Sequence, residues 1–194
     1  MFSNNLRLLI DLDGVCADFY GRVVQWYNED FTDTVKVSEV KSWDLNEHTY
    51  PKATHEYLIS YFNVPGFWEN LEPIEGCISS LGRLHKAGHE IVITTAIPDD
   101  CKLGFWEKSN WIKRHLPFVG HDNLIGAQKK ERVAGSVLLD DGPHNLRDYE
   151  GLTCAMDAPY NQGVPADFRV KTWSEFEMVV EGLANESSMQ SLSV

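Results

Sequence analysis

An apolar run ends in two acids and a glycine at Leu8-Leu9-Ile10-Asp11-Leu12-Asp13-Gly14-Val15. The run predicts a buried β-strand, and Gly14 allows the backbone to turn sharply where that strand ends. Asp11 and Asp13 project to the same face, because side chains alternate along a strand. Two carboxylates this close repel each other unless a cation or a shared proton relieves them, and Mg²⁺ is the economical cation. The alternative is an Asx turn that ends the strand and binds no ligand.

Further apolar strands alternate with helices along the chain, which predicts an α/β fold with a parallel sheet flanked by helices. We expect strands over residues 6–11, 90–95, 123–126, 137–141, 152–156 and 169–172. We expect helices over residues 17–28, 54–62, 74–87 and 105–115, after Pro143, and after a capping box at Ser174–Glu177.

Residues 30–70 lack strand patterns and are rich in aromatic side chains. We interpret this segment as a small helical cap that is inserted after the first strand. The core domain is then expected to comprise residues 1–29 and 71–184. The polar residues 185–194 are expected to form a disordered tail.

Polar groups follow three of the predicted strands, and the carboxyl ends of parallel strands meet at one edge of a sheet. Besides the two acids at residues 11 and 13, they are Thr94-Thr95 and Asp140-Asp141, with Lys129-Lys130 between these pairs. Carboxylates suit a metal ion, whereas a hydroxyl and an ammonium suit phosphoryl oxygens. Each group alone could be an ordinary strand residue, a surface lysine or a helix N-cap. Their combination in this order favours a site.

This order of groups resembles the four motifs of the haloacid-dehalogenase-like (HAD) phosphohydrolases, whose first motif is similar to residues 11–15. The resemblance implies a HAD-like Rossmannoid fold and Mg²⁺ as cofactor. It implies that Asp11 is the nucleophile and a metal ligand. It also implies that Asp13 is the general acid and base and lends its backbone carbonyl to the metal. Asp140 and Asp141 would complete the metal site, and the sequence leaves open which of them binds the ion directly and which through water.

The same resemblance assigns a hydroxyl and a lysine to the phosphoryl group. We prefer Thr95 over Thr94, because it lies nearer the expected end of its strand. We prefer Lys130 over Lys129, because its spacing to the acidic pair better matches the family. Thr94 and Lys129 stay as alternatives.

Longer stretches resemble the 5′(3′)-deoxyribonucleotidases within that superfamily. They are residues 11–19, 65–76, 111–116 and 138–141, so the likeness spans most of residues 6–150. It implies a Mg²⁺-dependent phosphomonoesterase that hydrolyses (deoxy)nucleoside monophosphates through an aspartyl-phosphate intermediate. The likeness is weakest over residues 31–54, and the acidic segment 96–100 departs from it. Base preference, sugar preference and the choice of a 5′ or a 3′ phosphate therefore stay open.

A nucleoside base needs flat apolar walls, which aromatic rings provide by stacking. The candidate rings are Phe19, Trp43, Phe62, Phe67 and Trp68. Of these we expect Phe19, Trp43 and Phe67 to bind substrate, together with Thr95 and Lys130. The alternative is that these rings form the core of the cap, since a small helical insertion must bury apolar groups of its own.

Composition limits the partners of this chain of 194 residues. A formal charge of −12 opposes binding to a nucleic-acid polymer, although a small nucleotide could enter a locally positive pocket. Without a long apolar run or a signal peptide, we expect no membrane span. The spacing of the four cysteines predicts unpaired thiols in the cytoplasm. The expected partner is a small phosphate ester, and a homodimer stays open.

Two other functions stay open at this point. One is a HAD phosphatase that acts on another small ester, such as a sugar phosphate. The other is a non-catalytic nucleotide-binding protein on the same fold. Intact carboxylates at residues 11 and 13 count against the second, because the loss of either would be its obvious mark.

Overall fold

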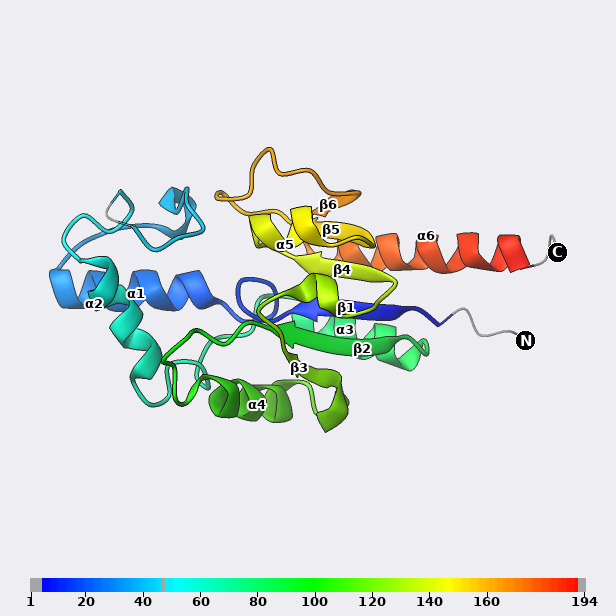
Figure 1. Cartoon of the computed structure of the whole chain (residues 1–194), viewed down its shortest axis with the longest axis horizontal. Coiled ribbons are helices and arrows are strands. Elements are labelled where there is room, and N and C mark those ends of the chain that lie inside the picture. The colour runs from blue at the N-terminus through cyan, green and yellow to red at the C-terminus, as the bar shows by residue number, and fades with distance from the viewer. Residues whose placement is uncertain (1–4, 47, 192–194) are drawn as a thin grey trace.

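The computed structural model describes residues 5–46 and 48–191, and its centre is a parallel sheet in the order β3-β2-β1-β4-β5-β6 (Figure 1). The strands are β1 (Arg7–Asp11), β2 (Glu90–Thr95), β3 (Leu124–Gly126), β4 (Val137–Asp140), β5 (Leu152–Met156) and β6 (Phe168–Val170). In register, Ile10 of β1 lies opposite Ile93 of β2 and Leu139 of β4. The predicted α/β fold with a parallel sheet is confirmed.

Six α-helices and four short 3₁₀ helices lie around this sheet in the described part of the chain. The α-helices are α1 (Phe19–Phe31), α2 (His55–Ser60), α3 (Cys77–Lys86), α4 (Gly104–His115), α5 (Pro143–Asp148) and α6 (Trp173–Ser191). Short 3₁₀ turns are η1 (Val37–Glu39), η2 (Tyr61–Asn63), η3 (His121–Asn123) and η4 (Lys130–Arg132). No helix within residues 5–46 and 48–191 is long and apolar enough to cross a membrane.

The two faces of the sheet pack against different apolar clusters. Leu8 of β1 belongs to a large cluster that includes Leu81 of α3 and Phe176 of α6. Leu9 points the other way and belongs to a small cluster with Tyr149, which follows α5. Because the central strands are covered on both faces, they read as continuous apolar runs rather than as alternating ones.

The cap lies beyond the carboxyl end of β1, and α1 and α2 stand apart from the two chain ends in Figure 1. Helix α1 reaches from the core into the cap, so the boundary expected at residue 30 falls within its last turn. Aromatic rings fill the cap: Phe67, for example, lies edge-on to Trp26 and to Trp68, at centroid distances of 5.3 and 4.9 Å. The division into core and cap stays our interpretation of this arrangement.

Several predicted helix ends differ from the structure; α1, for example, covers Phe19–Phe31 rather than residues 17–28. Helix α3 begins at Cys77 rather than at residue 74, because Gly76 adopts a φ of +86° immediately before it. The capping box expected at Ser174–Glu177 is wrong: Thr172 Oγ1 accepts from the Glu175 backbone amide at 3.2 Å. The N-cap of α6 is therefore Thr172, two residues before the expected Ser174, because Trp173, the first residue of the helix, is buried in the core.

The tail expected from residue 185 is also wrong as far as Ser191, because α6 continues to that residue. Residues 185–191 contain neither glycine nor proline, so helical hydrogen bonding can propagate beyond the packed part of α6. The rest of the expected tail, residues 192–194, lies outside the described residues.

Candidate active site

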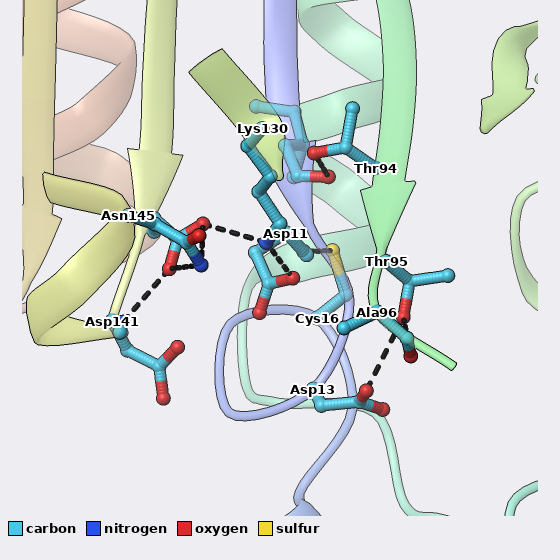
Figure 2. A network of polar contacts seen from close by, with 12 residues as sticks. Asp11, Asp13, Cys16, Thr94, Thr95, Ala96, Lys130, Asp141 and Asn145 are labelled. Carbon is cyan, nitrogen blue, oxygen red and sulfur yellow. Dashed lines mark hydrogen bonds and ion pairs between the residues drawn. The ribbon is translucent and has the colours of Figure 1, made fainter. Parts of the chain in front are cut away.

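The carboxyl ends of three adjacent strands carry polar side chains at one edge of the sheet (Figure 2). Asp11 ends β1, Thr95 ends β2 and Asp140 ends β4. Asp13 lies in the loop that follows β1, and Asp141 directly follows β4. The parallel sheet therefore gathers groups that are far apart in the chain, at the edge where open α/β sheets bind their ligands.

Asp11, Asp140 and Asp141 form a buried cluster with one oxygen of each carboxylate within 4.8 Å of the others. Lys130 reaches between two of them: its Nζ donates to Asp140 Oδ2 at 2.6 Å and also to Asp11 Oδ1 (Figure 2). One ammonium opposes three carboxylates, so negative charge remains for a divalent cation to neutralise. Hard oxygen donors of this kind suit Mg²⁺, and the residues present fit such an ion.

Asp140 is held by donors other than Lys130. The backbone amide of Gly142 donates to Asp140 Oδ1 at 2.7 Å, and Asn145 Nδ2 lies 3.1 Å from the same oxygen. Both donors come from the turn that opens α5, where Pro143 has no amide hydrogen of its own to satisfy. The carboxylate is thus oriented before any ion binds.

Burial and mutual repulsion perturb the acids of this cluster. Burial raises the pKa of Asp11 well above its ordinary value, and Lys130 partly opposes that rise. Burial, with the nearby charge of Asp140, raises the pKa of Asp141 to about 7. Burial alone would lower the pKa of Lys130, but Asp11 and Asp140 outweigh it and raise that pKa. Lys130 is therefore charged at any physiological pH.

A second buried ammonium, which the sequence analysis missed, faces Asp13. Lys108 of α4 donates to Asp13 Oδ2, to Thr95 Oγ1 at 3.0 Å and to the carbonyl of Ala96 at 2.7 Å. Its Nζ also lies 4.2 Å from the centre of the Trp68 ring. The side chain of Lys108 is 1% exposed, so its amino group is held in place beside the predicted acid and base.

A signal for Lys108 was present in the sequence. Lys108 stands three and four residues before Trp111 and Ile112, which places it on the apolar face of α4. A lysine on the buried face of a helix requires partners of opposite charge or polarity, and such residues gather at functional sites.

Asp13 turns toward this second ammonium and lies outside the three-carboxylate cluster. Thr95 Oγ1 is 3.3 Å from Asp13 Oδ2, and Asp13 Oδ1 is buried without a hydrogen-bond partner in the described part of the chain. Figure 2 shows Asp13 pointing across to Thr95. The use of Asp13 as a metal ligand through its backbone carbonyl stays a prediction.

The structure separates the paired candidates of the sequence. Thr94 points to the backbone carbonyl of Ile10, at 3.5 Å, whereas Thr95 contacts Asp13. Lys129 is 62% exposed and lies near Glu131, whereas Lys130 is buried among the carboxylates. In each pair the preferred residue contacts an acid of the site, but Thr95 itself is fully buried, so its contact with a phosphoryl group stays a prediction.

A cavity of about 210 Å³ opens between these groups and the cap. Its floor includes Asp11, Asp13, Lys108 and Lys130. Its walls are mostly aromatic or apolar and come largely from the cap and α1: Phe19, Tyr20, Trp43, Leu45, Ile59, Phe62 and Trp68. A charged floor under apolar walls suits a ligand with a charged end and a flat apolar end.

The structure brings two of the three predicted substrate-binding rings to this cavity. Phe19 lies parallel to Trp68, 5.6 Å away, and Trp43 is 43% exposed with its ring 4.7 Å from that of His144. Phe67 is instead fully buried in the interior of the cap, and its neighbour Trp68 lines the cavity. Consecutive aromatic residues point in different directions, and the sequence could not tell which faced inward.

Solved structures with a similar fold are HAD-family hydrolases. A HAD-family hydrolase from Deinococcus radiodurans R1, solved with bound phosphate and sodium, matches with a TM-score of 0.63 at 12% identity, covering 93% of this chain and 97% of that one. A haloacid dehalogenase-like hydrolase from Streptococcus pneumoniae matches with a TM-score of 0.63 at 12% identity, covering 92% and 100%. The fold is therefore the HAD-like Rossmannoid fold expected from the sequence.

The sequence model of the family described as 5′ nucleotidase, deoxy (Pyrimidine), cytosolic type C protein matches residues 4–185. The chain belongs to this family of phosphoric monoester hydrolases. It is 30% identical to the 5′(3′)-deoxyribonucleotidase of Bacillus subtilis (strain 168) over 172 residues, which is 88% of this chain and 95% of that protein. It is 27% identical to the 5′(3′)-deoxyribonucleotidase of Clostridium acetobutylicum over 180 residues, or 93% and 97%.

Proposed function

We propose that this enzyme is a Mg²⁺-dependent nucleotidase that hydrolyses (deoxy)nucleoside monophosphates through an aspartyl phosphate on Asp11. The observation that carries the proposal is the position of Asp11. Its carboxylate lies at the floor of the cavity, beside Lys130 and beneath aromatic walls. The names of the related enzymes support the same substrate class.

The first half of the reaction forms a bond between an Asp11 oxygen and phosphorus and breaks the bond from phosphorus to the nucleoside oxygen. Asp13 gives its proton to that leaving oxygen. Lys130, Lys108 and the hydroxyl of Thr95 stabilise the charge on the phosphoryl oxygens. Mg²⁺ held by Asp11, Asp140 and Asp141 would offset the repulsion between the nucleophile and the phosphoryl group.

The second half releases phosphate. Asp13, now ionised, takes a proton from a water molecule, and the water oxygen attacks phosphorus while the bond to Asp11 breaks. The product is inorganic phosphate, and Asp11 returns to a carboxylate. Lys108 suits this cycle, because its Nζ donates to Asp13 Oδ2 and to Thr95 Oγ1 and so holds the carboxyl group of Asp13 in one position.

The cavity walls support a nucleoside as the leaving group. Phe19, Trp43 and Trp68 provide faces on which a base can stack. The net charge of −12 favours a small nucleotide over a polymer. We further propose a cytoplasmic location, since the thiols of all four cysteines are free.

The test is phosphate release from a panel of 5′ and 3′ nucleoside monophosphates, with ribose or deoxyribose, and of sugar phosphates, each with Mg²⁺ and with chelator. Chelator-sensitive hydrolysis of nucleotides is the expected result. Hydrolysis of sugar phosphates alone would retain the chemistry and overturn the substrate class. Turnover of no compound would favour the binding protein that the sequence left open.

The mechanism is tested by Asp11→Asn, which keeps the shape of the side chain and removes the nucleophile. We expect phosphate release to fall by about a thousandfold or more, with the unfolding midpoint retained. Asp33→Asn is the matched control, because Asp33 pairs with Lys52 on the cap. Near-normal turnover by Asp11→Asn would contradict a covalent intermediate on Asp11.

A further inference from the structure

The loop of residues 157–164, between β5 and β6, holds Asp141 at two points. The hydroxyl of Tyr160 donates to Asp141 Oδ2, and Asn161 Nδ2 donates to the backbone carbonyl of Asp141 at 3.0 Å. This loop lies outside the strand ends that carry the carboxylates and outside residues 11–19, 65–76, 111–116 and 138–141, which carry the family resemblance in the sequence analysis. Side chain and backbone of one acid in the cluster are therefore fixed by consecutive residues of a separate segment.

The loop that carries Tyr160 is itself rigidly braced. Asn161 is fully buried, and its Nδ2 also donates to the carbonyl of Met156 at 2.8 Å. Arg169 of β6 donates to Asn161 Oδ1 at 2.8 Å, to the Asn161 carbonyl at 3.1 Å and to the Val164 carbonyl at 3.0 Å. These bonds tie the loop to β5 and β6, so Tyr160 is presented from a fixed backbone.

Packing also fixes the ring of Tyr160. Its centroid lies 4.6 Å from that of Tyr20, whose hydroxyl donates to the backbone carbonyl of Trp43 in the cap at 2.8 Å. On the other side lies Gly14, where an added Cβ would be 3.2 Å from the Tyr160 hydroxyl and 2.2 Å from Asp141 Oδ2. A glycine at this turn thus leaves room for the contact between tyrosine and aspartate.

We propose that Tyr160 is a positioning residue for the metal site, which aims the Asp141 carboxylate at the ion shared with Asp11 and Asp140. This inference rests on the proposed function, because it assumes that the cluster binds Mg²⁺. A carboxylate has two oxygens and about four acceptor sites, so one hydroxyl can stop its rotation and leave sites for a cation. Partners that orient a ligand in this way typically change metal affinity by about 10- to 100-fold when they are removed.

The competing explanation is that the Tyr160 hydroxyl only supplies a hydrogen bond to the buried carboxylate of Asp141 and so stabilises the fold. Tyr160→Phe separates the two, because it removes the hydroxyl and keeps the ring against Tyr20. The matched control is Tyr61→Phe: Tyr61 donates to Asp30 Oδ2 at 2.6 Å, a bond of the same kind within the cap. Each full-length variant is titrated with Mg²⁺ in a calorimeter without substrate, and its unfolding midpoint is measured in chelator.

We expect Tyr160→Phe to bind Mg²⁺ about tenfold more weakly than the wild type, and Tyr61→Phe to bind it equally well. In turnover assays, Tyr160→Phe should need about tenfold more Mg²⁺ for half-maximal rate and should recover most of its kcat at saturating Mg²⁺. If the variant is too unstable for calorimetry, the rise of its unfolding midpoint with added Mg²⁺ gives the same comparison.

Mg²⁺ binding by Tyr160→Phe within twofold of the wild type, or tighter, would overturn the positioning role while the proposed function stands. A lower midpoint in chelator with unchanged Mg²⁺ affinity would assign Tyr160 to stability alone. A wild-type protein that binds no Mg²⁺ would overturn both the metal-dependent mechanism and this inference.

Discussion

Lys130 is fully enclosed and shares its ammonium between Asp11 and Asp140. When no cation is bound, the positive charge of Lys130 offsets part of the negative charge of the three buried carboxylates. Removal of one partner from a buried ion pair costs more than the pair contributes, since the remaining charge is left in a poor solvent. The identity of this one side chain therefore affects both stability and turnover.

We predict that Lys130→Met lowers the free energy of unfolding by about 3–5 kcal/mol in chelator, as measured by urea denaturation. Added Mg²⁺ should restore part of this loss, because the ion supplies the missing positive charge. Phosphate release should fall strongly even at saturating Mg²⁺, since the phosphoryl group loses a ligand. Lys129→Met is the control and should change stability by less than about 0.5 kcal/mol. Equal stability of the two variants would contradict the charge compensation by Lys130.

Sequence reasoning found the site residues that stand next to one another at strand ends and missed those that meet only in space. Asp11, Asp13, Asp140 and Lys130 are marked by the apolar strands before them or by their order along the chain. Lys108 comes from the middle of a helix, where its only signal is its place on the apolar face, and Tyr160 comes from a loop without such a signal. Their roles arise when α4 and the loop fold back over the strand ends.

At the scale of elements, α4 fastens the segment through which the cap returns to the core. Glu107, only 2% exposed, accepts the backbone amides of Gly66 at 2.7 Å and Trp68 at 3.1 Å. Next to it in sequence, Lys108 supports Asp13. One turn of α4 therefore sets the position of a cavity wall and of Asp13, the proposed catalytic acid, together.

We predict that Glu107→Ala destabilises the protein by about 2 kcal/mol or more, because the buried amide of Trp68 and the half-buried amide of Gly66 lose their acceptor. Trp68 would then be free to shift, so KM for a nucleotide should rise more than kcat falls. Glu107→Gln keeps one carbonyl oxygen and should lie between the wild type and the alanine variant. Thermal unfolding and steady-state kinetics measure the two effects.

The control for this prediction is Glu69→Ala, which removes an ion pair with Arg114 at the surface of the same helix. Exposed pairs contribute about 0–1 kcal/mol, so this variant should retain its KM and most of its stability. A Glu107→Ala variant with unchanged KM would show that Trp68 keeps its position without the two hydrogen bonds to Glu107.

Elements with strong local patterns were predictable, and their ends were less so. β2 runs over residues 90–95 as expected, because its apolar run is bounded by polar residues on both sides. Helix α3 begins three residues late, and the N-cap of α6 is Thr172 rather than the expected Ser174. In both cases tertiary packing near Trp173 competes with the local capping signals, and a single sequence does not reveal that competition.

At the scale of the whole molecule, the core and the cap enclose one cavity whose floor carries excess negative charge. Folding concentrates acids that would be well solvated in the unfolded chain, so their ionisation opposes folding. The pKa of Asp141, ordinarily 3.8, is raised to about 7 chiefly by burial, and that of Asp11 is raised in the same direction. An acid with a raised pKa in the folded state binds protons there preferentially, so the metal-free protein should lose stability as pH rises from about 4 to about 7.

On the proposed function, Mg²⁺ should reverse this trend, because an ion that binds the ionised carboxylates of the folded state stabilises that state by mass action. Below pH 7 a proton on Asp141 competes with the ion, so affinity should fall by up to about tenfold per pH unit for that one proton. We therefore predict that the rise of the unfolding midpoint caused by Mg²⁺ is small at pH 5.5 and reaches its full size near pH 8. Asp141→Asn should bind Mg²⁺ more weakly and with a flatter pH dependence, since the titrating group is gone. An equal effect of Mg²⁺ on the wild type at pH 5.5 and pH 8 would contradict Asp141 as a ligand that must lose its proton.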